Sequence, residues 1–230
     1  MGEQRFCYKY PHPAVAADCV IFGFDGVSIK VLLIQRGAEP YMGRWAFPGG
    51  FMNMDETVEQ CAQRELEEET GLKSVAVEQF YTFSAVDRDP RERVISVAHY
   101  ALVRLSEVQG GDDAALARWF AMDEIPSLAF DHDEMLKMAK NRLKERLHLE
   151  PMGIELMPET FSMNELQNLY EAIMEQKFDC KKFSDNMLNL GILSEVYSCQ
   201  TKLSQNESRK YRFNTEKYEE LKQKGFELNF

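Results

Sequence analysis

Runs of apolar residues in the first half of the chain predict a β-sheet. The segments 14–24 and 27–36 have the composition of buried strands, and Asp25-Gly26 between them is typical of a tight hairpin. Further strands are predicted over residues 75–84, 93–105 and 118–122. Because a helical pattern interrupts this series, we expect an α/β fold, a mixed sheet with helices on its faces.

The interrupting helix is predicted to follow Thr57. Thr57 and Gln60 have the spacing of a capping box, and Ala62 and Leu66 recur four residues apart on one face. Gly71 is suited to end the helix, because glycine adopts left-handed backbone angles readily.

A second helix is predicted over residues 133–147, after the triplet Asp131-His132-Asp133. The triplet has the residue types of a metal site or an acid–base site. An aspartate just before a helix more commonly accepts hydrogen bonds from the amides of the first turn. We therefore expect Asp131 or Asp133 to cap this helix.

Two prolines and a glycine break the pattern at residues 148–158, which predicts a linker. The rest of the chain predicts two helices and then two strands, at residues 162–176, 181–191, 192–199 and 209–213. Helix, helix and hairpin are the outline of a winged helix-turn-helix. We therefore expect two domains, residues 1–150 and 151–230.

Glutamates crowd one turn of the first predicted helix. At about 100° per residue, Glu65, Glu68 and Glu69 share one helix face. Their repulsion is relieved if a divalent cation lies among them, because hard cations such as Mg2+ prefer carboxylate oxygens and leave positions for phosphates. A solvated acidic face is the alternative, and for three such acids alone it is the more common one.

The composition is that of an ordinary soluble protein. With 230 residues, 44% of them hydrophobic, and a net charge of −11, the chain can form one core and a second, smaller one. It has neither the long apolar run of a membrane helix nor a signal-peptide pattern, so we expect a cytoplasmic protein with no membrane partner. The five cysteines include no CxxC pair, which argues against structural zinc and against a disulfide framework.

The acidic helix and the glycine-rich bend before it match a longer pattern. A glycine, five residues, Glu, seven residues and then Arg-Glu-apolar-x-Glu-Glu-x-Gly-apolar resembles the Nudix box. The matching positions are Gly50, Glu56, Arg64, Glu65, Leu66, Glu68, Glu69, Gly71 and Leu72. The resemblance implies the Nudix α/β/α sandwich with a mixed sheet.

The family hydrolyses nucleoside diphosphates linked to another moiety, with Mg2+ or Mn2+ as cofactor. The implied metal ligands are Glu65, Glu68, Glu69 and the Gly50 carbonyl. The implied catalytic residues are Glu65 and Glu68, with Arg64 and Glu56 holding the ligands in position. The general base varies within the family, being a glutamate of the box in some members and an acid on a later loop in others, and the candidates for the latter in this chain are Asp112, Asp113 and Glu124.

The stretch from Asp87 to Val97 resembles the corresponding loop and strand of ADP-ribose pyrophosphatases and of the Nudix-related transcriptional regulators. Its arginines are suited to phosphate or ribose. The aromatic residues just before the glycines either fix the loop by packing, the more common role, or stack on a base. The predicted substrate-binding residues are Arg36, Trp45, Phe47, Arg88 and Arg91.

The whole chain resembles those regulators, in which a Nudix domain senses a nucleotide or sugar and a C-terminal winged helix binds operator DNA. The segment 161–174 matches the first helix of that winged domain. The expected recognition helix departs from the family, because Asp185 lies among its few basic residues, and residues 151–230 hold 10 Lys and Arg against 13 Asp and Glu. The predicted DNA contacts are Lys181, Lys182, Lys202, Arg209 and Lys210.

Two functions are compatible with the sequence. One is Mg2+-dependent hydrolysis of an ADP-ribose-like nucleoside diphosphate. The other is ligand-responsive regulation of transcription through binding to double-stranded DNA. Intact metal ligands are unnecessary for sensing and the recognition helix is weakened, so the sequence alone favours hydrolysis. The family resemblance also implies a homodimer.

Overall fold

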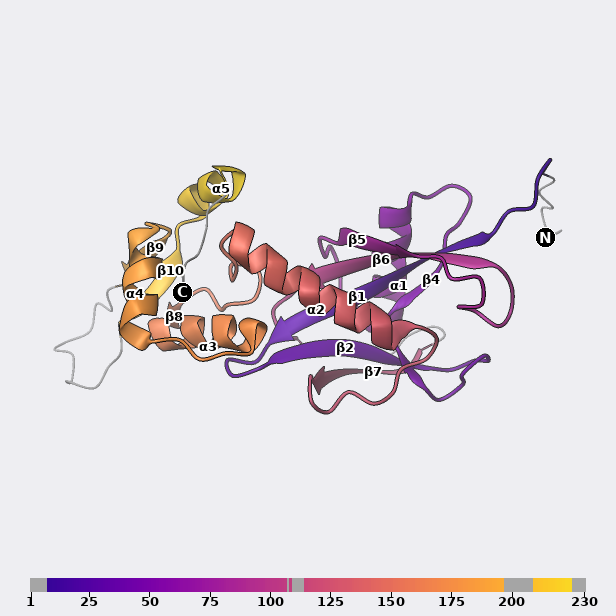
Figure 1. Ribbon diagram of the computed structural model, residues 1–230, viewed down its shortest axis with the longest axis horizontal. Helices are drawn as coiled ribbons and strands as arrows, with labels where there is room; N and C mark the ends of the chain where they lie inside the picture. The colour runs from indigo at the N-terminus through magenta and orange to yellow at the C-terminus, as the bar shows by residue number, and fades with distance from the viewer. Residues whose placement is uncertain (1–7, 107, 109–113, 197–208, 225–230) are drawn as a thin grey trace.

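The computed structural model of the protein describes residues 8–106, 108, 114–196 and 209–224. Figure 1 shows an N-terminal unit built on a large sheet and a C-terminal helical unit at the opposite end of the molecule from the N-terminus. The long helix α2 (His132–Leu149) reaches from one unit to the other.

Seven strands form the sheet of the N-terminal unit. They are β1 (Ala14–Phe24), β2 (Ile29–Arg36), β3 (Trp45–Ala46), β4 (Gly49–Phe51), β5 (Glu78–Phe83), β6 (Val94–Leu102) and β7 (Ala114–Ala121). The order is β3-β2-β1-β6-β5, with β4 also paired to β1 and β7 to β2. Strands β1 and β6 are parallel and the other pairs are antiparallel, so the predicted mixed sheet is confirmed.

The hairpin between β1 and β2 forms where the sequence predicts it. The carboxylate of Asp25 accepts hydrogen bonds from the amides of Val27 (2.9 Å) and Ser28 (2.7 Å), and Gly26 adopts a φ of 94°. These bonds turn the chain, so β2 begins at Ile29 rather than at residue 27. The short strands β3 and β4 were not predicted.

One helix covers each face of the sheet. Helix α1 (Val58–Thr70) buries Cys61, Ala62 and Leu66 against one set of alternating β1 residues. Helix α2 packs on the other set through residues spaced at about one turn, namely Met135, Ala139, Leu143 and Leu147. The α/β/α sandwich is therefore confirmed.

The C-terminal unit has the predicted outline of helix, helix and hairpin. Its elements are β8 (Phe161–Ser162), α3 (Met163–Met174), α4 (Cys180–Asn189), β9 (Leu193–Val196), β10 (Lys210–Phe213) and α5 (Thr215–Lys224). The strands form a small antiparallel sheet in the order β8-β10-β9. A capping box of Ser162 and Glu165 starts α3, and Asp179 caps α4. The winged helix fold is therefore confirmed, with an additional helix, α5.

The segment between α2 and β8, predicted as a linker, is packed in the core rather than exposed. Met152, Leu156 and Met157 are at most 2% exposed and belong to the core cluster that includes the sheet and α3. The hydroxyl of Tyr218 in α5 also donates a 2.6 Å hydrogen bond to the Pro151 carbonyl. A domain boundary at residue 150 thus stays a prediction. No helix among the described residues is long and apolar enough to cross a membrane.

Candidate functional site

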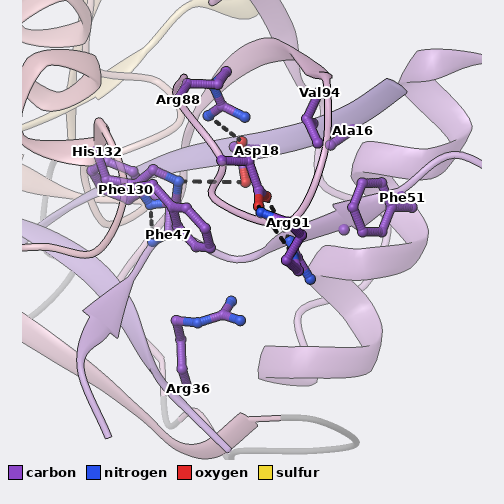
Figure 2. Close-up of a pocket in the computed structure, with 13 residues that line it drawn as sticks. Ala16, Asp18, Arg36, Phe47, Phe51, Arg88, Arg91, Val94, Phe130 and His132 are labelled. Atoms are coloured by element: carbon purple, nitrogen blue, oxygen red, sulfur yellow. Dashed lines mark hydrogen bonds and ion pairs between the residues drawn. The ribbon is translucent and has the colours of Figure 1, made fainter. Parts of the chain in front are cut away.

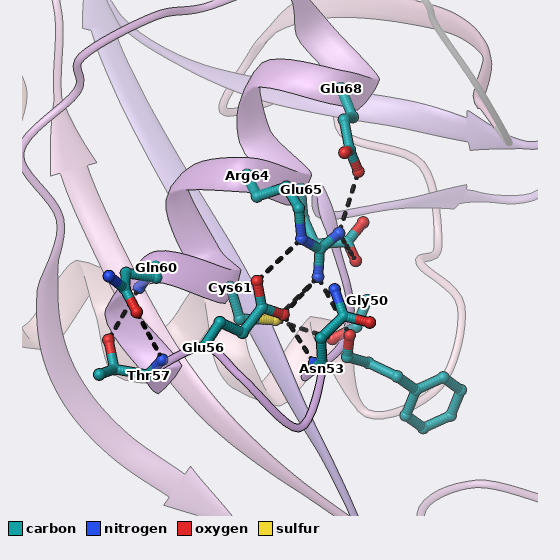
Figure 3. Close-up of polar contacts among 10 residues, drawn as sticks. Gly50, Asn53, Glu56, Thr57, Gln60, Cys61, Arg64, Glu65 and Glu68 are labelled. Carbon is teal, nitrogen blue, oxygen red and sulfur yellow. Dashed lines mark hydrogen bonds and ion pairs between the residues drawn. The ribbon is translucent and has the colours of Figure 1, made fainter. Parts of the chain in front are cut away.

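Arg64 lies at the centre of an ion-pair network on the outer face of α1. Its guanidinium donates hydrogen bonds of 2.9 and 2.6 Å to Glu56, 2.7 Å to Glu65 and 3.0 Å to Glu68 (Figure 3). The contact with Arg64 lowers the pKa of Glu56 to about 2. The predicted capping box of Thr57 and Gln60 is present as well and fixes the first turn of the helix.

Glu69 lies apart from this network, on the side of α1 that faces the sheet. It is only 7% exposed, and its carboxylate accepts a 2.9 Å hydrogen bond from the Gly49 amide. Burial raises the pKa of Glu69 to about 8, more than this hydrogen bond lowers it. Glu65 packs against the next glycine, because a Cβ on Gly50 would lie 2.3 Å from its Oε1 atom. Burial also raises the pKa of Glu65.

The three glutamates line one cavity of about 580 Å³, together with Gly49 and Gly50. Within the described part of the chain, no group of three or more His, Cys, Asp or Glu side chains is already arranged around an ion position. Only one oxygen of each glutamate accepts the hydrogen bonds described above, so the other oxygens are available. A set of carboxylate and carbonyl oxygens is what Mg2+ and Mn2+ prefer, so the donor chemistry fits such an ion.

The predicted arginines line this cavity or the pocket beside it. Arg36 and Arg91 line it, and both also line a smaller inner pocket that includes Arg88 (Figure 2). Arg91 makes a bidentate contact with Asp89, at 3.0 and 2.7 Å. The cavity is therefore lined by the three glutamates of α1, with Arg64 beside them, and by Arg36 and Arg91; we call these groups its acidic wall and its basic wall.

The capping prediction for Asp131 and Asp133 is wrong. Asp131 is the residue before α2, but its carboxylate makes a bidentate contact with Arg88, at 2.9 and 2.7 Å, and accepts nothing from the helix. Asp133 accepts a 3.2 Å hydrogen bond from the Leu128 amide, which precedes the helix. A buried guanidinium requires a charged partner, and Arg88, 8% exposed, takes Asp131 for this purpose.

Asp18 and His132 belong to the site, although the sequence analysis did not single out Asp18 and interpreted the triplet that contains His132 as a helix cap. Asp18 accepts a hydrogen bond from the Ser96 hydroxyl and lies 3.7 Å from both Arg88 Nη2 and His132 Nε2. His132 accepts a 3.0 Å hydrogen bond from the Phe47 amide, and burial lowers its pKa. The available signal was an acid inside the otherwise apolar run of β1, since a buried carboxylate requires partners.

The two predicted aromatic residues lie in different surroundings. Phe47 is 1% exposed, lines the inner pocket and stacks on the His132 ring at 5.3 Å. Trp45 lies edge-on to Phe120 at 4.7 Å and lines neither of the two cavities. The geometry thus agrees with the packing role for both residues, and base stacking by either stays a prediction.

Of the three later acids that are candidate general bases, only Glu124 falls within the described residues. It is exposed in a turn after β7 and lines neither cavity. Asp112 and Asp113 lie outside the described residues, so their role as a base stays a prediction.

Four of the five predicted DNA contacts are placed by the structure. Lys181 and Lys182 are exposed in the first turn of α4, whose other face is anchored by buried Phe183. Arg209 lies 3.6 Å from Glu195, and Lys210 lies 3.0 Å from Glu165, so both of these charges are partly compensated. Lys202 lies outside the described residues.

Comparisons with known proteins agree with both units. The family model of the NUDIX domain matches residues 12–139, and that of the NrtR DNA-binding winged helix domain matches residues 153–213. The chain is 33% identical over 229 residues to the ADPR responsive transcriptional repressor NtrR of Acinetobacter baylyi, covering 95% of this chain and 91% of the relative. It is 43% identical over 128 residues to an ADP-ribose pyrophosphatase of Methanocaldococcus jannaschii, covering 56% and 73%.

Solved structures of Shewanella oneidensis NrtR are similar to nearly the whole chain. The protein alone superposes with a TM-score of 0.73 at 26% identity, covering 89% of this chain and 95% of NrtR. Its complex with a 27mer DNA gives 0.71 at 25% identity with the same coverage. Its NUDIX domain with ADP ribose gives 0.55 at 31% identity, covering 58% and 90%. The chain therefore belongs to the Nudix family, as a member that also carries a winged helix domain of the NrtR type.

Proposed function

We propose that this protein is a transcriptional regulator that binds an ADP-ribose-like nucleoside diphosphate in its Nudix unit and double-stranded DNA through its winged helix. One observation carries the proposal. The same chain contains a cavity with an acidic and a basic wall and a winged helix whose α4 exposes two lysines. Relatives that match the chain over most of its length include the NtrR repressor and NrtR.

The cavity has the charge distribution that suits a diphosphate with a bound cation. An ion held by the glutamates of α1 can contact diphosphate oxygens from one side, and Arg36 and Arg91 can contact them from the other. The inner pocket adds the carboxylates of Asp18 and Asp89, which can accept hydrogen bonds from ribose hydroxyls. The cavity volume of about 580 Å³ is in the range of small-molecule sites.

The support for DNA binding comes from where the lysines of the winged helix lie rather than from the net charge of the chain. Phe183 and Met187 fix α4 on the core of the unit, and this leaves Lys181 and Lys182 directed outward. Positive charge in the first turn of a recognition helix can contact phosphates as the helix enters the major groove. A local basic patch can bind DNA even when the chain carries a net charge of −11.

DNA selection tests the regulator directly. The full-length protein is used to select duplexes from a random-sequence pool, and mobility shifts of the selected duplexes are measured with and without ADP-ribose. We expect enrichment of specific sequences and a change in DNA affinity of about 5-fold or more with ADP-ribose. Equal enrichment by the Lys181→Ala/Lys182→Ala variant, or an affinity that ADP-ribose leaves unchanged, would contradict the proposal.

Hydrolysis is the second candidate, and the complete Nudix box favours it. Glu65, Glu68, Glu69 and the Gly50 carbonyl would hold Mg2+ or Mn2+, while Glu56 fixes Arg64 behind them. The bound cation would supply an activated water and neutralise the charge of the leaving phosphate. The pyrophosphatase relative is 43% identical over the Nudix unit. Hydrolysis and regulation are compatible, since cleavage would remove the ligand that controls DNA binding.

Incubation of the purified protein with ADP-ribose tests hydrolysis. Release of AMP in Mg2+ or Mn2+, and none with a chelator present, is the expected result. The control is the rate of AMP release in buffer without protein. If the protein releases AMP no faster than this control, at concentrations at which calorimetry shows ADP-ribose to be bound, hydrolysis is excluded and the regulator remains.

A further inference from the structure

The three arginines around the ligand cavity differ in how their charge is compensated. Arg88 is bound in a bidentate contact to Asp131, and Arg91 in one to Asp89. Arg36 has no carboxylate partner within 4 Å among the described residues, and it lines both the large cavity and the inner pocket. Of the three, Arg36 therefore keeps the positive charge that is most available to an anionic ligand.

The position of Arg36 is set by two kinds of contact. Its Nε atom donates a 2.8 Å hydrogen bond to the Pro40 carbonyl, and an Nη2 contact of 3.5 Å reaches the Ala38 carbonyl. Its guanidinium also lies over the ring of Phe130, 4.8 Å from the centroid. A guanidinium over an aromatic face is held by a cation–π attraction, which leaves its edge free to donate hydrogen bonds.

Phe130 is held in an unusual backbone conformation at this position. Its φ is 53°, which a bulky side chain rarely adopts, and such residues concentrate at functional sites. Its neighbours on both sides maintain the conformation. The Ala129 amide donates to the Trp45 carbonyl at 2.8 Å, and Asp131 is bound by Arg88. The backbone of the turn before α2 therefore fixes the position of the Phe130 ring.

The surroundings of the ring restrict it further. Tyr41 packs edge-on against it at 4.8 Å, His132 lies 5.5 Å away, and Arg91 lies 5.9 Å from its centroid. Figure 2 shows Phe130 and His132 on one side of the inner pocket, with Arg36 and Arg91 beside it. Movement of the ring would require Tyr41 or His132 to move, so the ring provides a rigid support for Arg36.

We propose that Phe130 is a positioning residue, whose ring directs the uncompensated guanidinium of Arg36 onto the diphosphate of the bound ligand. The inference rests on the proposed function in one respect, that the cavity takes a nucleoside diphosphate. It adds the residue that presents the charge. Phe130 lies outside the Nudix box and lines the inner pocket, and in this proposal it acts on the diphosphate through Arg36.

Calorimetric titration of the full-length protein with ADP-ribose, in Mg2+, tests the proposal. The variants Phe130→Leu and Phe130→Met remove the ring at similar volume, and Phe130→Tyr keeps it. We expect the two ring-free variants to lose roughly 2- to 30-fold in affinity, the range of a cation–π contact. Phe130→Tyr is expected to remain within about 2-fold of the wild type.

A double-mutant cycle separates positioning from general damage. In an Arg36→Gln background the loss caused by Phe130→Leu should disappear, because the group that the ring positions is already gone. Phe120→Leu is the matched control, since it deletes a cation–π contact of similar length, 4.9 Å to Arg118, away from both cavities. This control is expected to alter stability and to leave the affinity for ADP-ribose unchanged.

Each outcome decides between the alternatives. Equal losses from Phe130→Leu in the wild-type and Arg36→Gln backgrounds, or wild-type affinity in the ring-free variants, would overturn the positioning role while leaving the proposed function intact. A wild-type protein that binds no ADP-ribose would instead remove the proposed function, and this inference with it. If Phe130→Leu does not fold, Phe130→Met carries the same comparison, and failure of both to fold would show that the ring serves the fold and overturn the proposal.

Discussion

Gly49 and Gly50 are adjacent in β4, yet alanine at each position is expected to have a different effect. A Cβ on Gly49 would lie 2.4 Å from the Ala17 carbonyl oxygen and 2.8 Å from the Asp18 Cα, both backbone atoms of the paired strand β1. Real Cβ contacts essentially never fall below 3.0 Å. The strands must therefore separate by about 0.6 Å or more, and overpacking of this kind costs about 1–3 kcal/mol.

A Cβ on Gly50 meets a side chain instead. It would lie 2.3–2.7 Å from the carboxyl group of Glu65, which is the mobile end of a flexible chain. Glu65 can move away and lose its 2.7 Å contact with Arg64. Arg64 then still has its hydrogen bonds to Glu56 and Glu68. Because the ion pair of Arg64 and Glu65 is partly exposed, we expect the free energy of unfolding to fall by about 1 kcal/mol or less. The displaced carboxylate then no longer lines the cavity at its original position.

Thermal unfolding and Mn2+ titration in the presence of ADP-ribose distinguish the two variants. Gly49→Ala should lower Tm by roughly 2–12 °C, given 2–4 °C per kcal/mol for a chain of this size. Gly50→Ala should keep a nearly wild-type Tm and lose roughly 10- to 100-fold in Mn2+ affinity, as expected for a displaced ligand. A Gly50→Ala variant with wild-type Mn2+ affinity and a Tm as low as that of Gly49→Ala would refute the reasoning.

Three further results are expected. Glu68→Gln should abolish AMP release while leaving circular dichroism and Tm unchanged, because it removes charge but little volume; a wild-type kcat would contradict the metal assignment. Lys181→Ala/Lys182→Ala should weaken DNA binding and lower the slope of log affinity against log salt by roughly one to two units, and an unchanged slope would exclude phosphate contacts by these lysines. Burial raises the pKa of Glu171, but its hydrogen bonds, led by that from Lys177, outweigh this and lower the pKa to about 2. Its contribution to stability should therefore be present above about pH 4.5 and be lost as the pH falls toward 2, whereas Glu171→Gln should show a flatter acid limb in urea unfolding; equal limbs would contradict this.

Elements with a local signal were predicted well, and elements without one were missed. The predicted capping box at Thr57 is formed by residues three apart, so the sequence contains the complete motif. Strands β3, β4 and β8 are two or three residues long, too short to show a period. Helix α5 has a single buried residue, Tyr218, so its sequence lacks an apolar stripe.

The packed segment after α2 shows how tertiary contacts change the meaning of a local pattern. Prolines and a glycine indicate a break in the helix, and α2 does end at Leu149. They do not indicate whether the segment is free or buried. The 3.1 Å hydrogen bonds between the Tyr170 hydroxyl and the main chain of Met152 join it to α3, across 18 residues.

The sequence by itself determined the Nudix box. Helical periodicity places Glu65, Glu68 and Glu69 within one turn, and a local repeat is sufficient for this because the partners are within four residues. Only the tertiary structure decided which residues come together in the basic wall and the inner pocket. Arg88 meets Asp131 across 43 residues and Phe47 meets His132 across 85, and such pairs depend on how strands and α2 pack rather than on any spacing in the chain.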